Sequence, residues 1–399
     1  MYDFNYIDEE LNKLQSFNLK RELKTIITAN GPWVELSSGQ RVLQFASNSY
    51  LGLTNHPDLI NATKAAVTKY GVGSTGSRLL SGTLELHTVL EDNIALFQKS
   101  EGALFFTSGY AANVGVISSL LSPQDTVYSD ELNHASIIDG IRLSGAHKFI
   151  YNHNDIEELE KLAQSNEGKY NRSFLVTDSV FGMNGDLAKL SEIAKVTEKY
   201  KIIPIVDEAH AIGVFGAQGA GYVSELKMEH MFPIRIGTCS KAVGVEGSFC
   251  VAPKNVIELL KNKARTFMFS TSSSPGVVGT VLKAIELVAE SDWRREKLWQ
   301  NAKKLHEGLS KICKLKIAPM QTPIIIIFFN SIEEALKVSK RLFEECHIWA
   351  PPIRPPSVKT PLIRLSPIST HSEEDIDYVI KAFHYIAKDL QPSSLNAGV

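Results

Sequence analysis

Cysteine is scarce in this 399-residue sequence, and no long hydrophobic run is present. The four cysteines are scattered without a C-x-x-C pair, so we expect reduced thiols and neither a disulfide framework nor a metal site. The longest apolar run, residues 324–329, is too short to cross a bilayer. It lies between Pro323 and Asn330, which favours a buried strand.

An excess of positive charge is also lacking, since 42 basic residues face 44 acidic ones and the net charge is −2. We therefore expect no nucleic acid and no membrane as a partner. The first residues, MYDFNYIDEELNKLQSF, lack the basic and then apolar order of a secretory signal. From this we expect the chain to start near Met1 and to be cytoplasmic. A hydrophobic content of 44% indicates a globular protein of one large or two medium domains.

The chain divides into four segments that differ in hydrophobic pattern and charge. Residues 1–45 predict an amphipathic N-terminal arm followed by a short strand pair. Over residues 46–283, short β-branched runs alternate with helical segments, a pattern that predicts a large domain with a parallel sheet between helices. Residues 284–390 carry long charged helices and predict a smaller α+β domain. Residues 391–399 are expected to form a frayed tail.

Polar residues follow three of the predicted strands at the point where each strand ends. The first strand leads to Ser179, the second to Asp207 and His210, and the third to Thr238 and Lys241. Because the carboxyl ends of parallel strands line the ligand crevice of an open sheet, we expect these side chains to converge.

Lys241 lies in GTCSKAVG, where small residues surround the lysine after an apolar strand. A phosphate-binding P-loop has its glycines before the lysine, so an ATPase of that type is excluded. A solvated surface lysine is the common alternative for any single lysine. Since an acid and a histidine are expected at the neighbouring strand end, we favour a partly desolvated amine that forms a Schiff base with an aldehyde cofactor.

Pyridoxal 5′-phosphate (PLP) is such a cofactor, and it needs partners for its pyridine nitrogen, phenolic oxygen and phosphate. Asp207 and His210 suit the first two, with a helix N-cap and a structural hydrogen bond as their alternatives. The TSGY segment, residues 107–110, precedes a predicted helix whose free N–H groups suit a phosphate. His134 is expected at a helix start, where exposure to water explains it better than stacking on the cofactor ring.

The sequence contains, in this order, SNSYLGLTNHP, YGVGSTGSRLLSGT, TSGYAANVGVI, NHASIIDG, DSVFGMNGD, VDEAHAIGVFG and GTCSKAVG. Together these motifs resemble the α-oxoamine synthases, which are PLP enzymes with the aspartate aminotransferase fold, fold type I. The resemblance runs from about residue 20 to residue 385. It implies an α/β fold with a mostly parallel seven-stranded sheet between helices, a smaller α+β C-terminal domain, and a homodimer.

The resemblance also assigns roles at the cofactor. It makes Lys241 the Schiff-base lysine and catalytic base, and Asp207 the partner of the pyridine nitrogen. The other cofactor contacts that it implies are His210 and Ser179 at the phenolic oxygen, His134 stacked on the ring, and Gly109, Tyr110, Thr238 and, in the partner subunit, Thr271 at the phosphate.

The family joins an amino acid to an acyl thioester, in most members with loss of carbon dioxide. The resemblance implies that Asn48 and Arg364 hold the carboxylate of the amino acid. It implies three further substrate contacts: His134, Arg21 and Ser357. The run IRPPSV, residues 353–358, is similar to the I-R-P-P-T-V run of the 8-amino-7-oxononanoate synthases. These enzymes join L-alanine to a pimeloyl thioester of coenzyme A or acyl carrier protein in biotin synthesis, which is the activity we expect.

Other activities use the same lysine and aspartate. A glycine C-acetyltransferase is the first alternative. Residue 49 usually differs between that enzyme and the 8-amino-7-oxononanoate synthases, and the serine present here favours neither of them. A serine palmitoyltransferase comes next, and an ordinary aminotransferase would lack the NHAS and GTxSK contexts. A PLP-fold binding protein without turnover would be free to lose Lys241, which is present.

Overall fold

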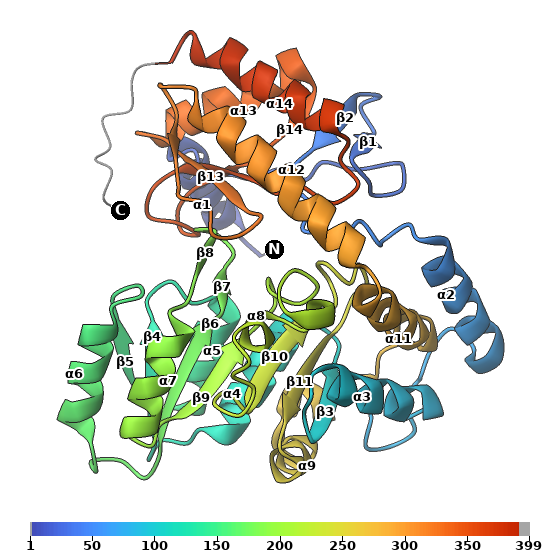
Figure 1. Ribbon diagram of the computed structural model, residues 1–399, viewed down its shortest axis with the longest axis vertical. Helices are drawn as coiled ribbons and strands as arrows, with labels where there is room; N and C mark the ends of the chain where they lie inside the picture. Colours follow the sequence, from blue (N-terminus) through green and yellow to red (C-terminus); the bar gives the residue numbers. More distant parts are fainter. Residues whose placement is uncertain (1, 391–399) are drawn as a thin grey trace. The chain divides into compact units, whose positions relative to one another are not determined.

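A computed structural model describes residues 2–390, so the expected tail, residues 391–399, lies outside the described residues. The chain forms two compact units, which Figure 1 shows as a ribbon. Unit 1 takes in residues up to Ser47, Met183–Gly185 and the residues from Lys297 onward. Unit 2 consists of Asn48–Gly182 and Asp186–Glu296.

Unit 2 is built on a seven-stranded sheet. The strand order is β3 (Gly102–Phe106), β11 (Ser248–Ala252), β10 (Ile234–Thr238), β9 (Ile203–Asp207), β6 (Ser173–Asp178), β4 (Thr126–Asp130) and β5 (His147–Tyr151). Only β11 runs antiparallel to its neighbours, and the remaining pairs are parallel. The predicted seven-stranded, mostly parallel sheet is therefore confirmed.

Helices cover both faces of this sheet because successive strand residues point to opposite sides. In β6, Phe174 and Val176 pack in one core and Leu175 packs in the other, and all are buried. Residues of α4 (Gly109–Leu120), α5 (Ala135–Ser144), α9 (Lys254–Lys263) and α10 (Arg265–Met268) complete the first core. The second core includes residues of α6 (Ile156–Asn166), α7 (Leu190–Lys199) and α8 (Tyr222–Glu225).

Three further helices of unit 2 pack together beside the sheet: α2 (Pro57–Tyr70), α3 (Glu85–Phe97) and α11 (Pro275–Ala289). Gly279 of α11 lies so close to α2 that a Cβ there would be 2.6 Å from the Cβ of Ala66. A short hairpin follows β6, with β7 (Val180–Phe181) paired to β8 (Asp186–Leu187). A 3₁₀ turn, η1 (Ala217–Gly219), precedes α8.

Unit 1 contains two small sheets and the C-terminal helices. The strand pair predicted near the N-terminus is present as β1 (Trp33–Glu35) and β2 (Arg41–Gln44), and β14 (Ile348–Trp349) extends it in parallel. The second sheet has the order β12 (Lys316–Ile317), β13 (Ile325–Phe328), β16 (Leu362–Leu365) and β15 (Pro352–Ile353). The helices are α1 (Asn5–Ser16), α13 (Ile332–Cys346) and α14 (Glu373–Ala387), while α12 (Asp292–Ser310) starts in unit 2.

The apolar run at residues 324–329 is confirmed as a buried strand, because it contains β13. Among residues 2–390, no helix combines the length and the apolar character that a membrane span requires.

We predict that Leu175→Ala lowers the free energy of unfolding by about 2–5 kcal/mol, because truncating a buried leucine loses apolar contacts and leaves a cavity. The side chain of Leu175 is fully buried between β6 and the α6–α7 layer. The control Leu143→Ala removes a leucine that is 66% exposed on α5 and should change the unfolding free energy by less than about 0.5 kcal/mol. Urea unfolding of both variants measures the difference, and equal losses would contradict the described core.

Candidate active site

Polar side chains meet at the carboxyl ends of β6, β9 and β10, which are neighbours in the sheet. The backbone N–H of Ser179 donates to the carbonyl of Asp207 at 2.8 Å. Lys241 follows the end of β10 by three residues, and its charge acts on the pKa of both His134 and Asp178. Of the residues expected to converge at this edge, Ser179 and Asp207 are therefore joined through their backbones, and Lys241 lies within electrostatic range of the same edge.

Asp207 is only 4% exposed at the end of β9. One carboxylate oxygen, Oδ1, accepts from the backbone N–H of Ala209 at 2.7 Å. The other, Oδ2, accepts from the Asn113 side-chain amide at 2.6 Å. Hydrogen bonds to an ionised acceptor are the strong ones, and they hold a buried carboxylate in one orientation. Asn113 was missed in the sequence, where its only signal is an amide on an otherwise apolar helix.

The same amide of Asn113 links Asp207 to His134. Its Nδ2 also donates to Ser136 Oγ at 3.0 Å, and Ser136 Oγ lies 2.7 Å from His134 Nδ1. The backbone N–H of Ser136 donates to His134 Nδ1 at 3.3 Å, so this nitrogen is an acceptor and Nε2 carries the proton of the neutral ring. His134 is an exposed N-cap of α5, as expected, and it is nevertheless joined to Asp207 through hydrogen bonds.

Two pKa shifts set the charges around this network. Desolvation lowers the pKa of His134, and Lys241 lowers it further against the opposing effect of Asp207, so the imidazole is neutral. Burial raises the pKa of Asp178 well above its ordinary value, and the nearby charge of Asp207 raises it further. Asp178 Oδ2 accepts from the backbone N–H of His134 at 2.8 Å, which ties β6 to the turn before α5.

His210 lies in a close-packed position on the loop after β9. Its Nδ1 is 2.8 Å from the Tyr50 hydroxyl. A Cβ on Gly182 would come within 2.1 Å of His210 Nε2, so only glycine permits the hairpin backbone to approach this ring. Tyr50 and Gly182 lie in the SNSYLGL and FGMNG stretches, and neither was singled out in the sequence.

Gly109 and Thr238 are brought together at the N-terminus of α4. A Cβ on Gly109 would lie 3.6 Å from Thr238 Oγ1, which in turn is 2.9 Å from Ser240 Oγ. Ser108 caps the helix by accepting from the Ala111 N–H at 3.1 Å. Free N–H groups and hydroxyls around a helix N-terminus suit a phosphate. The hydroxyl of the neighbouring Tyr110 is already engaged, because it donates to Asp139 of α5.

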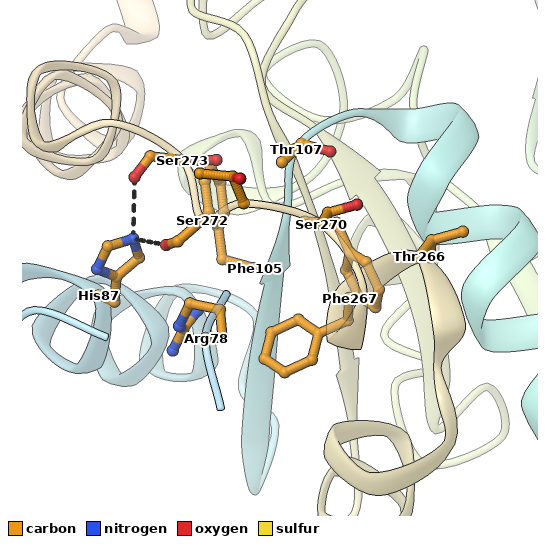
Figure 2. Close-up of a pocket in the computed structure, with 11 residues that line it drawn as sticks. Arg78, His87, Phe105, Thr107, Thr266, Phe267, Ser270, Ser272 and Ser273 are labelled. Atoms are coloured by element: carbon orange, nitrogen blue, oxygen red, sulfur yellow. Dashed lines mark hydrogen bonds between the residues drawn. The ribbon is translucent and has the colours of Figure 1, made fainter. Parts of the chain in front are cut away.

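Thr271 belongs to the loop Ser270–Ser273, which lines a pocket of unit 2 (Figure 2). His87 is buried beneath this loop, with Nδ1 accepting from the Leu84 N–H at 3.1 Å. Its Nε2 therefore carries the proton that faces Ser272 Oγ at 2.7 Å and the Ser273 carbonyl at 3.2 Å. Burial lowers the pKa of His87, and the charge of Arg78 lowers it further, so a neutral imidazole holds the Thr271 loop.

The loop that carries Lys241 is held by close backbone contacts. Gly213, in the AIGVFG stretch, has φ +78°, and a Cβ there would lie 2.6 Å from the Cβ of Ala242. Gly244 has φ +81° and would meet the backbone N of Thr54 at 3.0 Å. Left-handed backbone and close approach both favour glycine, so these positions allow the lysine loop to pack against its neighbours.

The remaining predicted substrate residues are distributed over both units. Asn48 begins unit 2, and its carbonyl accepts from the Tyr50 N–H at 2.7 Å. Arg364 is 7% exposed in β16 of unit 1. Also in unit 1, Arg21 Nη2 lies 3.5 Å from the Pro355 carbonyl. The exposed Ser357 is two residues further along the segment that Arg21 contacts.

Arg354 holds the segment that contains Arg21. Its Nε donates to the Asn18 carbonyl at 2.7 Å and its Nη2 donates to the Lys20 carbonyl at 2.9 Å. The guanidinium is buried, and burial lowers its pKa, as does the charge of Arg21. The IRPPSV run thus has a structural arginine beside Ser357, a role that its sequence did not reveal.

Comparison with known proteins gives consistent matches along the chain. Residues 40–383 match the family described as aminotransferase class I and II. An 8-amino-7-oxononanoate synthase of Thermoanaerobacter pseudethanolicus is 40% identical over 392 residues, with 98% of each chain covered.

Solved structures are also similar. A serine palmitoyltransferase of Sphingomonas wittichii has a TM-score of 0.90 and 30% identity, covering 97% of this chain and 98% of its own. An 8-amino-7-oxononanoate synthase of Francisella tularensis has a TM-score of 0.76 and 27% identity, and the match covers 87% of this chain and 98% of that one. A further serine palmitoyltransferase structure, with a TM-score of 0.91 and 30% identity, is described as containing PLP; 96% of this chain and 97% of that one are covered.

We predict that Asn113→Ala weakens cofactor binding by about 10- to 150-fold, because a hydrogen bond to a charged group contributes about 1.5–3 kcal/mol and its loss leaves Asp207 Oδ2 unsatisfied. Fluorescence titration of the apoprotein with PLP measures the dissociation constant. The matched control Asn262→Ala removes an amide on α9 whose partners are its own helix, Glu258. Unchanged binding in Asn113→Ala would show that Asp207 does not depend on this amide.

Gly213→Ala should destabilise the protein more than Gly168→Ala. Both glycines have positive φ, +78° and +72°, so both alanines carry backbone strain of about 1–2 kcal/mol. Only the alanine at residue 213 also meets another side chain, since no atom lies within 4 Å of a Cβ at Gly168. Melting temperatures and borohydride-trapped cofactor per chain provide the comparison, and equal behaviour of the two variants would refute the packing described for the lysine loop.

Proposed function

The chain belongs to the aminotransferase class I and II family, and from this membership we propose that it acts as an 8-amino-7-oxononanoate synthase. The reaction condenses L-alanine with a pimeloyl thioester and gives 8-amino-7-oxononanoate, carbon dioxide and the free thiol, a step of biotin synthesis. One observation carries this proposal: a curated enzyme of that name is 40% identical over 98% of both chains. The protein is thus a PLP-dependent acyltransferase.

The residues of the site fit PLP. When bound, this cofactor supplies an aldehyde that reacts with amines and a ring that accepts electrons. A buried carboxylate such as Asp207, fixed by Asn113, suits a protonated pyridine nitrogen. We assign His210 and Ser179 to the phenolic oxygen and Lys241 to the aldehyde. The phosphate contacts are proposed to be Gly109, Tyr110, Thr238 and the partner subunit's Thr271.

Lys241 is proposed to act twice. Its amine holds the cofactor before the amino acid arrives and, once displaced, takes the proton from Cα of alanine at Nζ. The neutral ring of His134, stacked on the cofactor, keeps the Nε2 proton available for a hydrogen bond to substrate. The lowered pKa of His134 supports this, because burial disfavours the cationic imidazole and the nearby charge of Lys241 disfavours it further.

Substrate binding is assigned to two groups of residues. Asn48 and Arg364 are proposed to hold the carboxylate of alanine, Arg364 by the bidentate geometry of its guanidinium. Arg21 and Ser357, which lie on adjoining segments of unit 1, are proposed to contact the acyl thioester. A homodimer, the choice between coenzyme A and acyl carrier protein, and a cytoplasmic location stay predictions.

Serine palmitoyltransferase is the alternative that a specific observation favours, namely the TM-score of 0.90. Fold similarity does not choose the substrate, because enzymes of one fold differ in their binding residues. The identity of 40% to an 8-amino-7-oxononanoate synthase exceeds the 30% to this structure and favours the synthase.

A substrate panel tests the proposal. The holoenzyme is mixed with L-alanine, glycine or L-serine, and then with a pimeloyl, acetyl or palmitoyl thioester, while free thiol and products are followed by mass spectrometry. We expect turnover with alanine and the pimeloyl thioester. Lys241→Ala should reduce the rate by about 10²–10⁴-fold, as expected for loss of a general base. Lys148→Ala, an exposed lysine of β5, serves as the matched control.

Two outcomes would contradict the assignment. Turnover of glycine with the acetyl thioester, or of serine with the palmitoyl thioester, in the absence of turnover with alanine would identify a different acyltransferase. Full activity in Lys241→Ala would remove the lysine from the mechanism.

A further inference from the structure

A second cluster of charged side chains lies at the same edge of the sheet, at the loop that follows β5. His153 sits between two carboxylates, with Nδ1 2.9 Å from Asp130 Oδ1 and Nε2 2.6 Å from Asp186 Oδ2. Asp130 is 2% exposed at the end of β4, while Asp186 opens β8. The His153 ring also packs edge-on against Phe181 of β7, with centroids 4.4 Å apart. We call His153, Asp130 and Asp186 the His153 cluster.

The Asp130 side of the cluster leads to His134. Asp130 Oδ1 also accepts from the Leu132 N–H at 2.9 Å, and Oδ2 accepts from the Asn154 N–H at 2.9 Å. Leu132 is two residues before His134, so this carboxylate fixes the beginning of the turn that ends at the N-cap of α5. Asp178 fixes the other end of the turn through the His134 N–H.

The Asp186 side of the cluster leads to His210. Asp186 is paired in register with Phe181 in the β7–β8 hairpin. Phe181 is followed by Gly182, whose backbone approaches the His210 ring so closely that a Cβ on Gly182 would lie 2.1 Å from His210 Nε2. A shift of the hairpin therefore changes the packing against His210, and His153 is the side chain that holds Asp186 in place.

The charges of the cluster require a cation at its centre. Burial alone would lower the pKa of His153, but hydrogen bonds and the charges of Asp130 and Asp186 raise it to about 9. Asp186 Oδ1 is buried and, within residues 2–390, accepts no hydrogen bond. Two carboxylates so close to one imidazole would repel each other if the ring were neutral.

Other titratable groups lie near His153 in the chain or on the segments that contact it, while the charges that raise its pKa are those of Asp130 and Asp186. These other groups are Glu131, whose Oε1 accepts from the backbone N–H of His153 at 3.3 Å; Tyr151, whose pKa is affected by the charge of Asp130; Asp155, the N-cap of α6; and Lys189, whose Nζ donates to the Asn154 carbonyl at 3.0 Å. Burial raises the pKa of Tyr151, and the charge of Asp130 raises it further, so its hydroxyl stays neutral.

We propose that the His153 imidazolium is a positioning residue that holds the loops carrying His134 and Gly182 in the geometry the cofactor site requires. His153 touches neither loop's functional side chain and acts through Asp130 and Asp186. The roles of His134 and His210 in this inference rest on the proposed function. The electrostatic link itself depends only on the His153 cluster.

The pH dependence has a definite sign. The pKa of His153 is raised from 6.5 to about 9 on folding, so its contribution to stability is complete below about pH 6.5 and is lost as the pH rises through about 9. A neutral substitute such as glutamine has no such contribution at any pH. The difference between wild type and His153→Gln should therefore be large at pH 7 and small at pH 10.

Two measurements on the same proteins test this inference. At pH 7, His153→Gln should melt about 2–4 °C lower than wild type and bind PLP about tenfold more weakly. At pH 10, both differences should disappear, because the wild-type ring is then neutral. A role in packing alone would leave the same differences at both pH values. His147→Gln replaces an exposed histidine of the preceding strand, β5, and should match wild type throughout.

Asp186→Asn provides a second variant in case His153→Gln does not fold. Asp186 raises the pKa of His153, so removing this carboxylate lowers that pKa, and the loss of stability with rising pH should begin at a lower pH. The inference would be overturned if the difference in melting temperature between each variant and wild type were the same at pH 7 and pH 10. Convergence of melting temperature without convergence of PLP affinity would also overturn it, by separating the cluster from the cofactor site. Neither readout uses the alanine and pimeloyl substrates, so failure here is distinct from failure of the proposed function.

Discussion

Burial of the Asp207 carboxylate is the constraint around which the site is arranged. A buried charge is costly unless donors satisfy it, and the donors here are the Ala209 N–H and the Asn113 amide. Asn113 lies about one turn into α4, so the helix that satisfies Asp207 at its side also presents its N-terminus near Thr238. One helix thereby connects Asp207, proposed to partner the pyridine nitrogen, with Gly109 and Thr238, proposed to contact the phosphate.

The loops around this helix are held by contacts that tolerate little change. Gly213 and Gly244 hold the lysine loop, and Gly182 permits the hairpin to approach His210. The Thr271 loop rests on the neutral His87. Nearby, Arg78 and Glu91 form a buried pair through two hydrogen bonds of 2.8 and 2.9 Å, so neither charge is left uncompensated. Residues without a direct chemical role thus fix where the reactive groups lie.

The residues proposed to bind the cofactor and those proposed to contact the acyl thioester lie in different units of the chain. The fold that carries Lys241 and Asp207 is similar to solved structures named for more than one substrate class, a serine palmitoyltransferase and an 8-amino-7-oxononanoate synthase. Arg21 and Ser357 lie instead in unit 1, on segments that Arg354 ties together. Such a division allows the acyl group to change without disturbing the buried hydrogen bonds around Asp207.

Much of this could be predicted from local sequence. Alternating β-branched and helical patterns predicted a parallel sheet between helices because strands and helices bury residues with different periods, and the family resemblance implied its seven strands. Polar residues after β6, β9 and β10 identified Ser179, Asp207 and Lys241 because parallel strands end at one edge. Asn113, Tyr50, Gly182 and His153 were not found, since each resembles an ordinary helix, loop or strand-end residue. Their importance arises from partners 94, 160, 28 and 33 positions away, which only the tertiary structure brings within contact.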